Sequence, residues 1–502
     1  MRILGEIEAW IMDPESQRIC WISGVAGSGK TSVAKTVCQR ANANAEIMLG
    51  GSFFCSRSSG LAAQRDIRCV IPTLTQLLVL RSVESCLALT RIIDPGTQYK
   101  EVKAQIEQLL HPPLMVFRGH HVPILFVIDA LDECSGETSD GMLDEAMCHA
   151  VVTSMLEALV VLTQSDPRLP VKFLVTSRPE TQIRDTSISD ENFSHILRLH
   201  AADANEVNAD ISRYITTTLH TKLSNHPRLR SMITDGEVEH LVRLCNGLFI
   251  VAATALKHTF GAGADAAVAK FKRLLNASGD SLSTGVSASL DSMYTAVMED
   301  AVRADTSEAT QLSGLLRLIS SLLSTRTMLS VTSLTKILNL ELYDVRASFS
   351  RLHAVIHVPE DDDVPELRIV HASFGDYLLA RAPNHIRIPR SLGHYTLAHA
   401  CLDVMRRQLH FNISKIASSY ERQPSVRPDC ITPVLEYACL HWAHHLSASL
   451  RSDLADSDLL SFDAKVGLEF RPKFLFWLEV LSVMRKVNRA SGILLIAGSA
   501  VS

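Results

Sequence analysis

The chain has 502 residues, of which 47% are hydrophobic and 21% charged, and its formal net charge is −5. These proportions are close to those of ordinary globular proteins. They exclude a mostly disordered chain, a collagen-like chain and a strongly basic nucleic-acid-binding arm. At roughly 150 residues per domain, the length predicts about three domains. The weak net acidity provides no overall field that would attract DNA or an anionic membrane.

The 11 cysteines are odd in number, irregularly spaced and without a Cys-x-x-Cys pair. This pattern argues against a disulfide framework or a zinc cluster and favours a reducing compartment. The first 15 residues carry acidic side chains where a secretory signal needs a basic segment followed by an apolar one. No uncharged apolar stretch reaches about 18 residues, so we expect no transmembrane helix. We therefore expect a cytoplasmic protein.

Short apolar runs in the first 200 residues predict strands that are buried on both faces, as in a parallel sheet. Helical or mixed segments separate these runs, which is the alternation typical of a doubly wound α/β domain. The runs lie at 19–25, 122–131, 171–178 and 194–200, with 51–56 as a candidate fifth strand. The fold class predicted for this part is an α/β domain with a mostly parallel sheet of five or so strands.

After about residue 200 the apolar pattern changes to helical spacing, as in 205–223 and 236–260. The stretch 276–287 is rich in Ser and Gly and predicts a linker. Two short strands around the acidic turn 359–366 follow helical segments, which fits the wing of a winged helix. The expected domains are an α/β domain at 1–200, a helical domain at 201–280, a winged-helix domain at 288–385 and a helical C-terminal region at 386–502.

Residues 24–31 match the pattern G-x-x-x-x-G-K-[ST] at every position, between a predicted strand and a predicted helix. Glycines let the backbone wrap around phosphate oxygens beside the positive end of a helix. Lys30 supplies a cation that reaches the β- and γ-phosphates, and Thr31 supplies a hydroxyl ligand for Mg²⁺. The predicted nucleotide-binding residues of this loop are Gly24, Val25, Ala26, Gly27, Ser28, Gly29, Lys30, Thr31 and Ser32.

A second part of the site is expected where the apolar strand 124–128 leads into Asp129. A carboxylate on a strand tip beside the phosphate loop holds the Mg²⁺ shell, and Asp129 is predicted for that role. Asp132 and Glu133 lie one turn further on, where a carboxylate orients or deprotonates the attacking water. A solvated acidic loop is the competing interpretation of this pair.

Arg178 ends the apolar strand 171–178, at the edge where open α/β sheets place their ligands. A guanidinium there contacts the γ-phosphate and reports its presence. The alternative is an arginine paired with a surface carboxylate. The predicted catalytic residues are therefore Lys30, Asp132, Glu133 and Arg178.

Three of these segments together resemble the NACHT family of STAND-type P-loop NTPases: GVAGSGKTS (24–32), ILFVIDALDEC (124–134) and FLVTSRPE (173–180). CNGLFIVAATAL (245–256) is similar to the family's helical-domain motif near the adenine. RIVHASFGDYLLA (368–380) is similar to its winged-helix segment. The helical tail is similar to that of fungal NACHT proteins, so the resemblance covers nearly the whole chain.

The resemblance implies an ATP/ADP switch with Mg²⁺ and slow ATP hydrolysis. ADP would hold the domains closed, and exchange for ATP would permit opening and oligomerisation in signalling, as in fungal innate immunity. His371 is the candidate for a winged-helix histidine that touches the ADP β-phosphate, and a packed core histidine is the alternative. Phe249 stands where related switches often carry a proline against the base.

Such proteins usually carry an N-terminal effector and a C-terminal repeat sensor. Here the phosphate loop begins at residue 24, and no repeat follows the helical tail. We therefore expect either a truncated form or a minimal form that acts with separate effector and sensor chains. Homo- or hetero-oligomerisation would run through the NACHT domain.

Other functions remain open at this point. A conventional P-loop ATPase or kinase lacks support, because guanine and transporter signatures are absent and Arg57, Arg65 and Arg68 only weakly suggest a kinase lid. A nucleotide-binding scaffold without turnover would keep the same shape with ADP and ATP. The acidic wing argues against nucleic-acid binding. His441 and His445 indicate a packed helix with exposed histidines rather than a metal site.

Overall fold

The computed structural model describes residues 2–57, 62–90, 101–134, 137–138, 141–142, 145–199, 204–224, 226, 232–260, 264–277, 286–302, 308–415, 430–450, 466 and 470–501. The chain divides into two compact units. The first comprises Met1–Glu137, Met142–Leu256 and Thr284–Leu290, and the second comprises Thr138–Gly141, Lys257–Ser283 and Asp291–Ser502. The expected linker at 276–287 lies largely outside the described residues.

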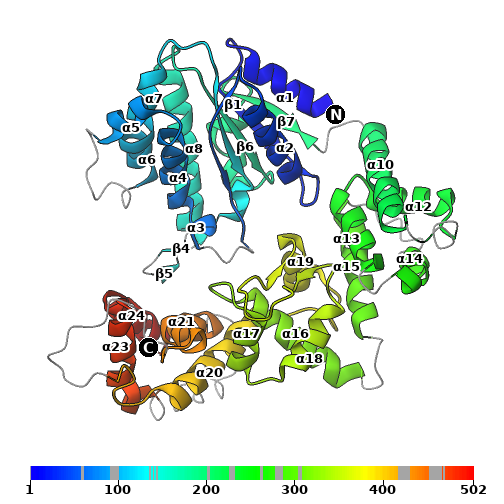
Figure 1. Ribbon diagram of the computed structural model, residues 1–502, viewed down its shortest axis with the longest axis vertical. Coiled ribbons are helices and arrows are strands. Elements are labelled where there is room, and N and C mark those ends of the chain that lie inside the picture. Colours follow the sequence, from blue (N-terminus) through cyan, green and yellow to red (C-terminus); the bar gives the residue numbers. More distant parts are fainter. Residues whose placement is uncertain are drawn as a thin grey trace. The chain divides into compact units, whose positions relative to one another are not determined.

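A five-stranded sheet forms the centre of the first unit (Figure 1). All the strand pairs are parallel, and the order across the sheet is β2-β3-β6-β1-β7. The strands are β1 (Ile19–Ser23), β2 (Met48–Phe54), β3 (Ile124–Asp129), β6 (Val171–Ser177) and β7 (Ser194–Arg198). The predicted α/β fold class is therefore confirmed, and the candidate strand at 51–56 is the end of β2.

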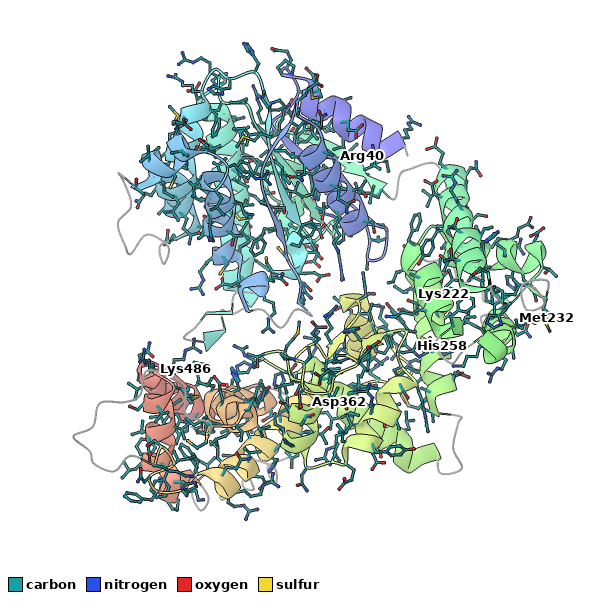
Figure 2. The ribbon with its side chains drawn as sticks, in the orientation of Figure 1. Arg40, Lys222, Met232, His258, Asp362 and Lys486 are labelled. Atoms are coloured by element: carbon teal, nitrogen blue, oxygen red, sulfur yellow. The ribbon has the colours of Figure 1, made fainter. Side chains whose placement is uncertain are left out.

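The central strands are buried on both faces, as their continuous apolar runs predict. Along β3, Phe126 and Ile128 join one hydrophobic core, while Leu125 and Val127 join the core on the opposite face. Helices α4 (Val70–Val79) and α8 (Glu145–Ser165) cover the first face. Helices α1 (Arg2–Met12) and α2 (Lys30–Ala43) cover the second, where Arg40, labelled in Figure 2, pairs with Glu8 at 2.8 Å.

Shorter helices and single turns complete this α/β part. They are α3 (Ala62–Arg65), η1 (Ile67–Cys69), α5 (Val83–Thr90), α6 (Val102–Gln105), η3 (Ile106–Leu110), α7 (His111–Leu114), η4 (Met115–Phe117), η5 (Leu131–Glu133), α9 (Thr181–Arg184) and η6 (Ser187–Ser189), with the two-residue strands β4 (Glu137–Thr138) and β5 (Gly141–Met142). The turn that matters for the site is η5, because it directly follows the end of β3.

Helices α10 (Ala204–Lys222), α12 (Asp235–Cys245) and α13 (Phe249–Phe260) follow the sheet in sequence. The helical spacing over 236–260 predicts one helical stretch, but the structure interrupts it. Asn246 and Gly247 have φ angles of 45° and 77°, in the left-handed region that ends helices. The break lets α13 start in a new direction, with Phe249 as its first residue.

The second unit is almost entirely helical. Its helices and turns are α14 (Ala264–Ala277), α15 (Val286–Val302), α16 (Glu308–Leu323), α17 (Val331–Leu338), α18 (Leu342–Ser350), α19 (Ala372–Asp376), η8 (Tyr377–Arg381), α20 (Arg390–Gln408), α21 (Pro433–Leu450), η10 (Arg471–Lys473), α23 (Phe474–Val483), η11 (Val487–Arg489) and α24 (Ala490–Val501). The first residues of α15 are assigned to the first unit.

One antiparallel strand pair, β8 (Ile356–His357) with β9 (Arg368–Ile369), lies in the second unit. The acidic turn between them is bound to neighbouring helices: Asp362, labelled in Figure 2, pairs with Arg346 of α18, and its carbonyl accepts a 3.0 Å hydrogen bond from the Thr332 amide of α17. Part of the negative charge of this turn is therefore neutralised by an ion pair within the fold.

The histidines of α21 correct one expectation. His445 is fully buried rather than exposed: its ring nitrogens lie 2.9 Å from Nδ1 of His394 and 2.8 Å from the Tyr437 hydroxyl. Within the described part of the chain, no group of three or more metal-ligating side chains is placed to hold a metal ion. His445 is thus part of a packed core, whereas His441 is half-buried beside the Tyr437 ring.

One described helical stretch, Cys148–Ser165, is long and apolar enough to cross a membrane by length and composition alone. It contains Glu157, and 44% of it is buried within the structure. Val152, Met155 and Leu156 from this stretch belong to the core beside the sheet. The same composition is expected of a core helix, so the stretch is weak evidence for a membrane segment.

Candidate functional site

The carboxyl ends of β1, β3 and β6 meet at one edge of the sheet, where the predicted site residues begin. Gly24 follows β1, and its amide donates a 3.2 Å hydrogen bond to the carbonyl of Ser177 at the end of β6. Gly27 and Gly29 have φ angles of 78° and 94°, which side-chain-bearing residues rarely adopt. The loop therefore turns sharply into α2, whose amino end begins at Lys30.

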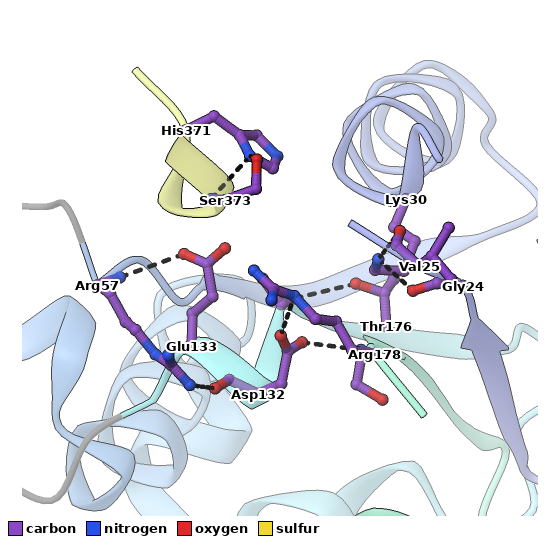
Figure 3. Close-up of polar contacts among 12 residues, drawn as sticks. Gly24, Val25, Lys30, Arg57, Asp132, Glu133, Thr176, Arg178, His371 and Ser373 are labelled. Carbon is purple, nitrogen blue, oxygen red and sulfur yellow. Dashed lines mark hydrogen bonds and ion pairs between the residues drawn. The ribbon is translucent and has the colours of Figure 1, made fainter. Parts of the chain in front are cut away.

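Lys30 is 9% exposed, and its ammonium group donates hydrogen bonds to the carbonyls of Gly24 at 2.6 Å and Val25 at 3.0 Å (Figure 3). Burial lowers the pKa of Lys30, while the carboxylates of Asp132 and Asp129 act in the opposite direction. An ammonium has three donors, and these two bonds use two of them. The third N–H is the one available to a phosphate oxygen.

The Ser28 hydroxyl adds a second polar group to the loop. Its oxygen is buried and, among the described residues, has no hydrogen-bond partner. A buried hydroxyl without a partner is costly in a folded chain. Together with the left-handed glycines and the amino end of α2, it fits a loop built to surround an anion.

Asp129 is the last residue of β3 and is 1% exposed. Thr176 donates a 2.6 Å hydrogen bond to its Oδ1, and the Thr31 hydroxyl lies near enough to lower the pKa of this carboxylate. Burial raises the pKa of Asp129, whereas these two hydroxyls and Lys30 counter the rise. Carboxylate and hydroxyl oxygens are ligands that Mg²⁺ prefers, so Thr31 and Asp129 together fit that ion.

Asp132 and Arg178 are bound to each other. One oxygen of Asp132 accepts a 3.0 Å hydrogen bond from the Arg178 amide, and the other lies 3.1 Å from Nε of Arg178 (Figure 3). Asp132 is 3% exposed, and Arg57 donates to its carbonyl at 2.7 Å. This carboxylate is therefore engaged in holding the arginine at the sheet edge.

Glu133 has a different environment, although it is the next residue. It is half-buried, and its Oε2 accepts a 3.2 Å hydrogen bond from the Arg57 amide. Burial, followed by the neighbouring charge of Asp132, raises the pKa of Glu133 to about 7. A carboxyl group with a pKa near neutrality is suited to accept and release a proton.

The first turn of α13 contacts the phosphate loop within the first unit. The Ile250 amide donates a 3.4 Å hydrogen bond to the carbonyl of Gly27, and a Cβ on Gly27 would lie 2.0 Å from Cγ2 of Ile250. Phe249 packs edge-on against Tyr214 of α10, with ring centroids 6.4 Å apart. Sequence reasoning singled out Phe249 but missed Ile250, whose only signal was its place next to Phe249 in the helical motif.

His371 belongs to the second unit. It caps the amino end of α19, where its Nδ1 lies 2.6 Å from the Ser373 hydroxyl, and that hydroxyl lies 2.8 Å from the hydroxyl of Tyr294. The remaining loop positions predicted to bind nucleotide, Val25, Ala26 and Ser32, lie in the loop and in the first turn of α2. Contact of His371 with nucleotide stays a prediction.

The fold and this sheet edge define a P-loop nucleotide-binding domain. Residues 4–178 match the family model described as nephrocystin 3, N-terminal, and the match ends at Arg178. The match covers the phosphate loop, Asp129 and Arg178, about a third of the chain, and it supports a P-loop NTPase domain of the NACHT/STAND kind in this segment. No curated protein matches the chain.

Several solved structures are similar at low identity. A STAND protein with a tetratricopeptide repeat sensor from Pyrococcus horikoshii has a TM-score of 0.38 at 11% identity, over 99% of this chain and 57% of that one. Cdc6p from Pyrobaculum aerophilum has a TM-score of 0.29 at 10% identity, over 75% of this chain and 83% of that one. Drosophila ORC bound to DNA has a TM-score of 0.32 at 11% identity, over 75% and 94%. This chain spans just over half the length of the first of these proteins.

Proposed function

We propose that the chain is an ATP/ADP-binding switch of the NACHT type that hydrolyses ATP slowly. One observation carries this proposal: at the end of the glycine-rich loop, the buried Lys30 ammonium is held by the carbonyls of Gly24 and Val25, with the buried Asp129 carboxylate as a charged neighbour. Thr31 and Asp129 would hold Mg²⁺, which supplies positive charge to the phosphates when it is bound. Lys30, Ser28 and the amides at the amino end of α2 would bind phosphate oxygens.

For hydrolysis, Glu133 is the residue that accepts a proton from the attacking water. Its pKa of about 7 allows it to be a base at neutral pH, and its Arg57 amide contact fixes the carboxylate. Asp132 is a positioning residue, because both of its oxygens hold Arg178. Arg178 would contact the γ-phosphate and so distinguish ATP from ADP.

The contact between Ile250 and Gly27 supports a coupling between the bound nucleotide and the helices that follow the sheet in sequence. A change in the phosphate loop acts directly on the amino end of α13, and α13 continues from the first unit into the second. In this proposal the domains are an α/β domain at 1–200, a helical domain at 201–280, a winged helix at 288–385 and a helical tail at 386–502. ADP keeps them closed through His371, and ATP permits oligomerisation.

The proposed setting is cytoplasmic signalling, of the kind that includes fungal innate immunity, with effector and sensor functions on other segments or chains. Nucleic acid is not among the proposed partners. Asp361, Asp362 and Asp363 place like charge where a wing would meet phosphate. The DNA in the Drosophila ORC structure is bound by ORC and is not proposed as a ligand of this chain.

The test is to purify the full chain, denature it and identify the released nucleotide by chromatography. We expect about one ADP per chain in the wild type and none in Lys30→Ala. Lys103→Ala is the matched control, because Lys103 is an exposed lysine on α6, and it should retain its ADP. An empty wild type that also fails to bind added ATP would contradict the proposal. Bound nucleotide with an identical hydrodynamic size in ADP and ATP would indicate a scaffold instead of a switch.

A further inference from the structure

Two cysteine thiols meet beside the acidic turn of the site. Cys55 follows β2 and Cys134 follows η5, and the Cys134 thiol donates to the Cys55 sulfur with the two sulfur atoms 2.9 Å apart. Cys55 is 4% exposed and Cys134 is 7% exposed. A disulfide bond is about 2.0 Å long, so a movement of about 1 Å would bring the sulfurs to bonding distance.

The backbone on both sides of this pair is fixed by parallel strand pairing. Phe54 at the end of β2 pairs with Asp129 at the end of β3, and the Cys55 amide donates a 3.0 Å hydrogen bond to the Asp129 carbonyl. The Cys134 amide donates to the carbonyl of Leu131 at 3.2 Å. The two thiols therefore face each other because of the sheet register, although 79 positions separate them in sequence.

We propose that Cys55 and Cys134 form a redox-modification site, in which a small peroxide converts the two thiols reversibly into a disulfide. One sulfur attacks the peroxide, so the O–O bond breaks, a sulfenic acid forms and water is released. The second sulfur then attacks the sulfenic sulfur, the S–S bond forms and a second water leaves. Two thiols and one hydrogen peroxide give one disulfide and two waters, with two electrons passing from sulfur to oxygen.

The environment of the two cysteines determines how fast the disulfide forms. Burial raises the pKa of Cys55, and the neighbouring Cys134, Asp129 and Glu133 raise it further. The small exposed fractions of both cysteines restrict the reaction to a small oxidant, so hydrogen peroxide should react where a bulky disulfide reagent does not.

A disulfide here would act on the residues assigned to hydrolysis, and this step rests on the proposed function. Arg57 is two residues beyond Cys55, and its amide holds Glu133, the residue before Cys134. The Arg57 guanidinium also holds the carbonyl of Asp132. A covalent link between Cys55 and Cys134 would draw these two segments about 1 Å closer together and displace Glu133 from the Arg57 amide that fixes its carboxylate. Turnover should then fall several-fold while nucleotide binding at Lys30 is kept.

The full chain is tested by treatment with hydrogen peroxide, alkylation of the remaining thiols, digestion without reductant and mass spectrometry. We expect a cross-linked peptide pair that contains Cys55 and Cys134, lacks two hydrogens and disappears after dithiothreitol. The wild type alone decides this, so no variant has to fold. Recovery of both peptides separately, alkylated or as sulfinic acids, would overturn the proposal.

Cysteine variants and measurements of ATP turnover complete the test. Cys134→Ser should lose the cross-link, whereas Cys245→Ser, which removes a buried thiol of α12, should form it as the wild type does. ATP turnover of the oxidised wild type should fall several-fold and return on reduction, with unchanged nucleotide content. A cross-link in a chain that binds no nucleotide would sustain the redox site and contradict the proposed function. A cross-link with unchanged ATP turnover would contradict the predicted effect of the disulfide on hydrolysis.

Discussion

Each end of the central sheet contains a buried lysine, and the two lysines have different hydrogen-bond partners. Lys172, at the start of β6, is 1% exposed, and its ammonium donates to the carbonyls of Asp13 at 2.8 Å, Ser16 at 3.2 Å and Gln17 at 3.4 Å, and to the Ser16 hydroxyl at 2.5 Å. Its Nζ also lies 5.2 Å from the Trp10 ring. At the opposite end, Lys30 has two carbonyl acceptors and several acidic neighbours.

This difference distinguishes a lysine that stabilises the fold from a lysine that can bind a ligand. The partners of Lys172 are neutral oxygens that use all of its donors, so it ties the turn after α1 to the sheet. The partners of Lys30 leave one donor over, and the carboxylates of Asp129, Asp132 and Glu133 are its charged neighbours. Substitutions at the first end should change stability, and substitutions at the second end should change nucleotide chemistry.

The largest expected effect is that of Glu133→Gln. Loss of a general base typically reduces turnover about 10²- to 10⁴-fold, and the amide keeps the size of the side chain, so ATP binding should persist. Single-turnover assays of the variant and the wild type measure this. Normal turnover in Glu133→Gln would move the role to Asp132 and contradict the distinction drawn between the two carboxylates.

The wild-type pH profile provides the control for that assignment. Because the pKa of Glu133 is about 7, the base is protonated at lower pH, and turnover should decline as the pH falls below about 7. A rate that is constant between pH 6 and pH 8, at roughly one unit on each side of that pKa, would exclude Glu133 as the base.

Asp129→Asn should remove the dependence of nucleotide affinity on Mg²⁺. The amide still accepts the hydrogen bond from Thr176 but lacks the negative charge that a divalent ion needs, so affinity in Mg²⁺ should fall about tenfold. Titrations with and without Mg²⁺ measure the change. An unaltered Mg²⁺ dependence would show that this carboxylate does not hold the ion.

Lys172→Met should lower the free energy of unfolding by about 1–3 kcal/mol, because it removes the hydrogen bonds that the buried ammonium donates to the part-buried carbonyls of Asp13, Ser16 and Gln17. Nucleotide affinity should be unchanged, since this lysine lies at the opposite end of the strand from Thr176 and Ser177. Denaturant unfolding and nucleotide titration of one preparation measure both quantities. A variant with normal stability and weakened binding would reverse the comparison.

A pH dependence of stability is also expected from Lys172. Burial lowers its pKa in the folded chain from 10.5 to about 8. Between about pH 8 and pH 10.5 the unfolded chain therefore binds more protons than the folded chain, and the free energy of unfolding rises with pH. The difference between wild type and Lys172→Met isolates this slope. A slope of the opposite sign would mean that the folded chain stabilises the charged lysine.

The sequence predicts the sheet and the glycine-rich turn from β1 into α2 well, because both depend on local patterns. Continuous apolar runs gave the strands, and the glycines with Lys30 and Thr31 gave the loop. Lys172 escaped notice because a single lysine in an apolar strand gives no sign of the carbonyls that surround it. Those carbonyls lie about 160 positions earlier in the chain.

The contacts that distinguish neighbouring residues are also invisible in the sequence. Asp132 and Glu133 are adjacent and chemically alike, yet one holds Arg178 and the other meets the Arg57 amide. Likewise, the register of β2 against β3 brings Cys55 next to Cys134. Such pairings depend on the order of strands in the sheet, which spacing along the chain does not specify.

The most direct test of the central claim is a titration of ATP and ADP, with Mg²⁺, into the wild type, Lys30→Met and Lys172→Met. We predict equal dissociation constants for the wild type and Lys172→Met, and binding by Lys30→Met that is weaker by about 10- to 100-fold, as expected for loss of a hydrogen bond from a charged group. Equal binding by all three proteins, or weaker binding by Lys172→Met alone, would contradict the assignment of the site to the Lys30 end of the sheet.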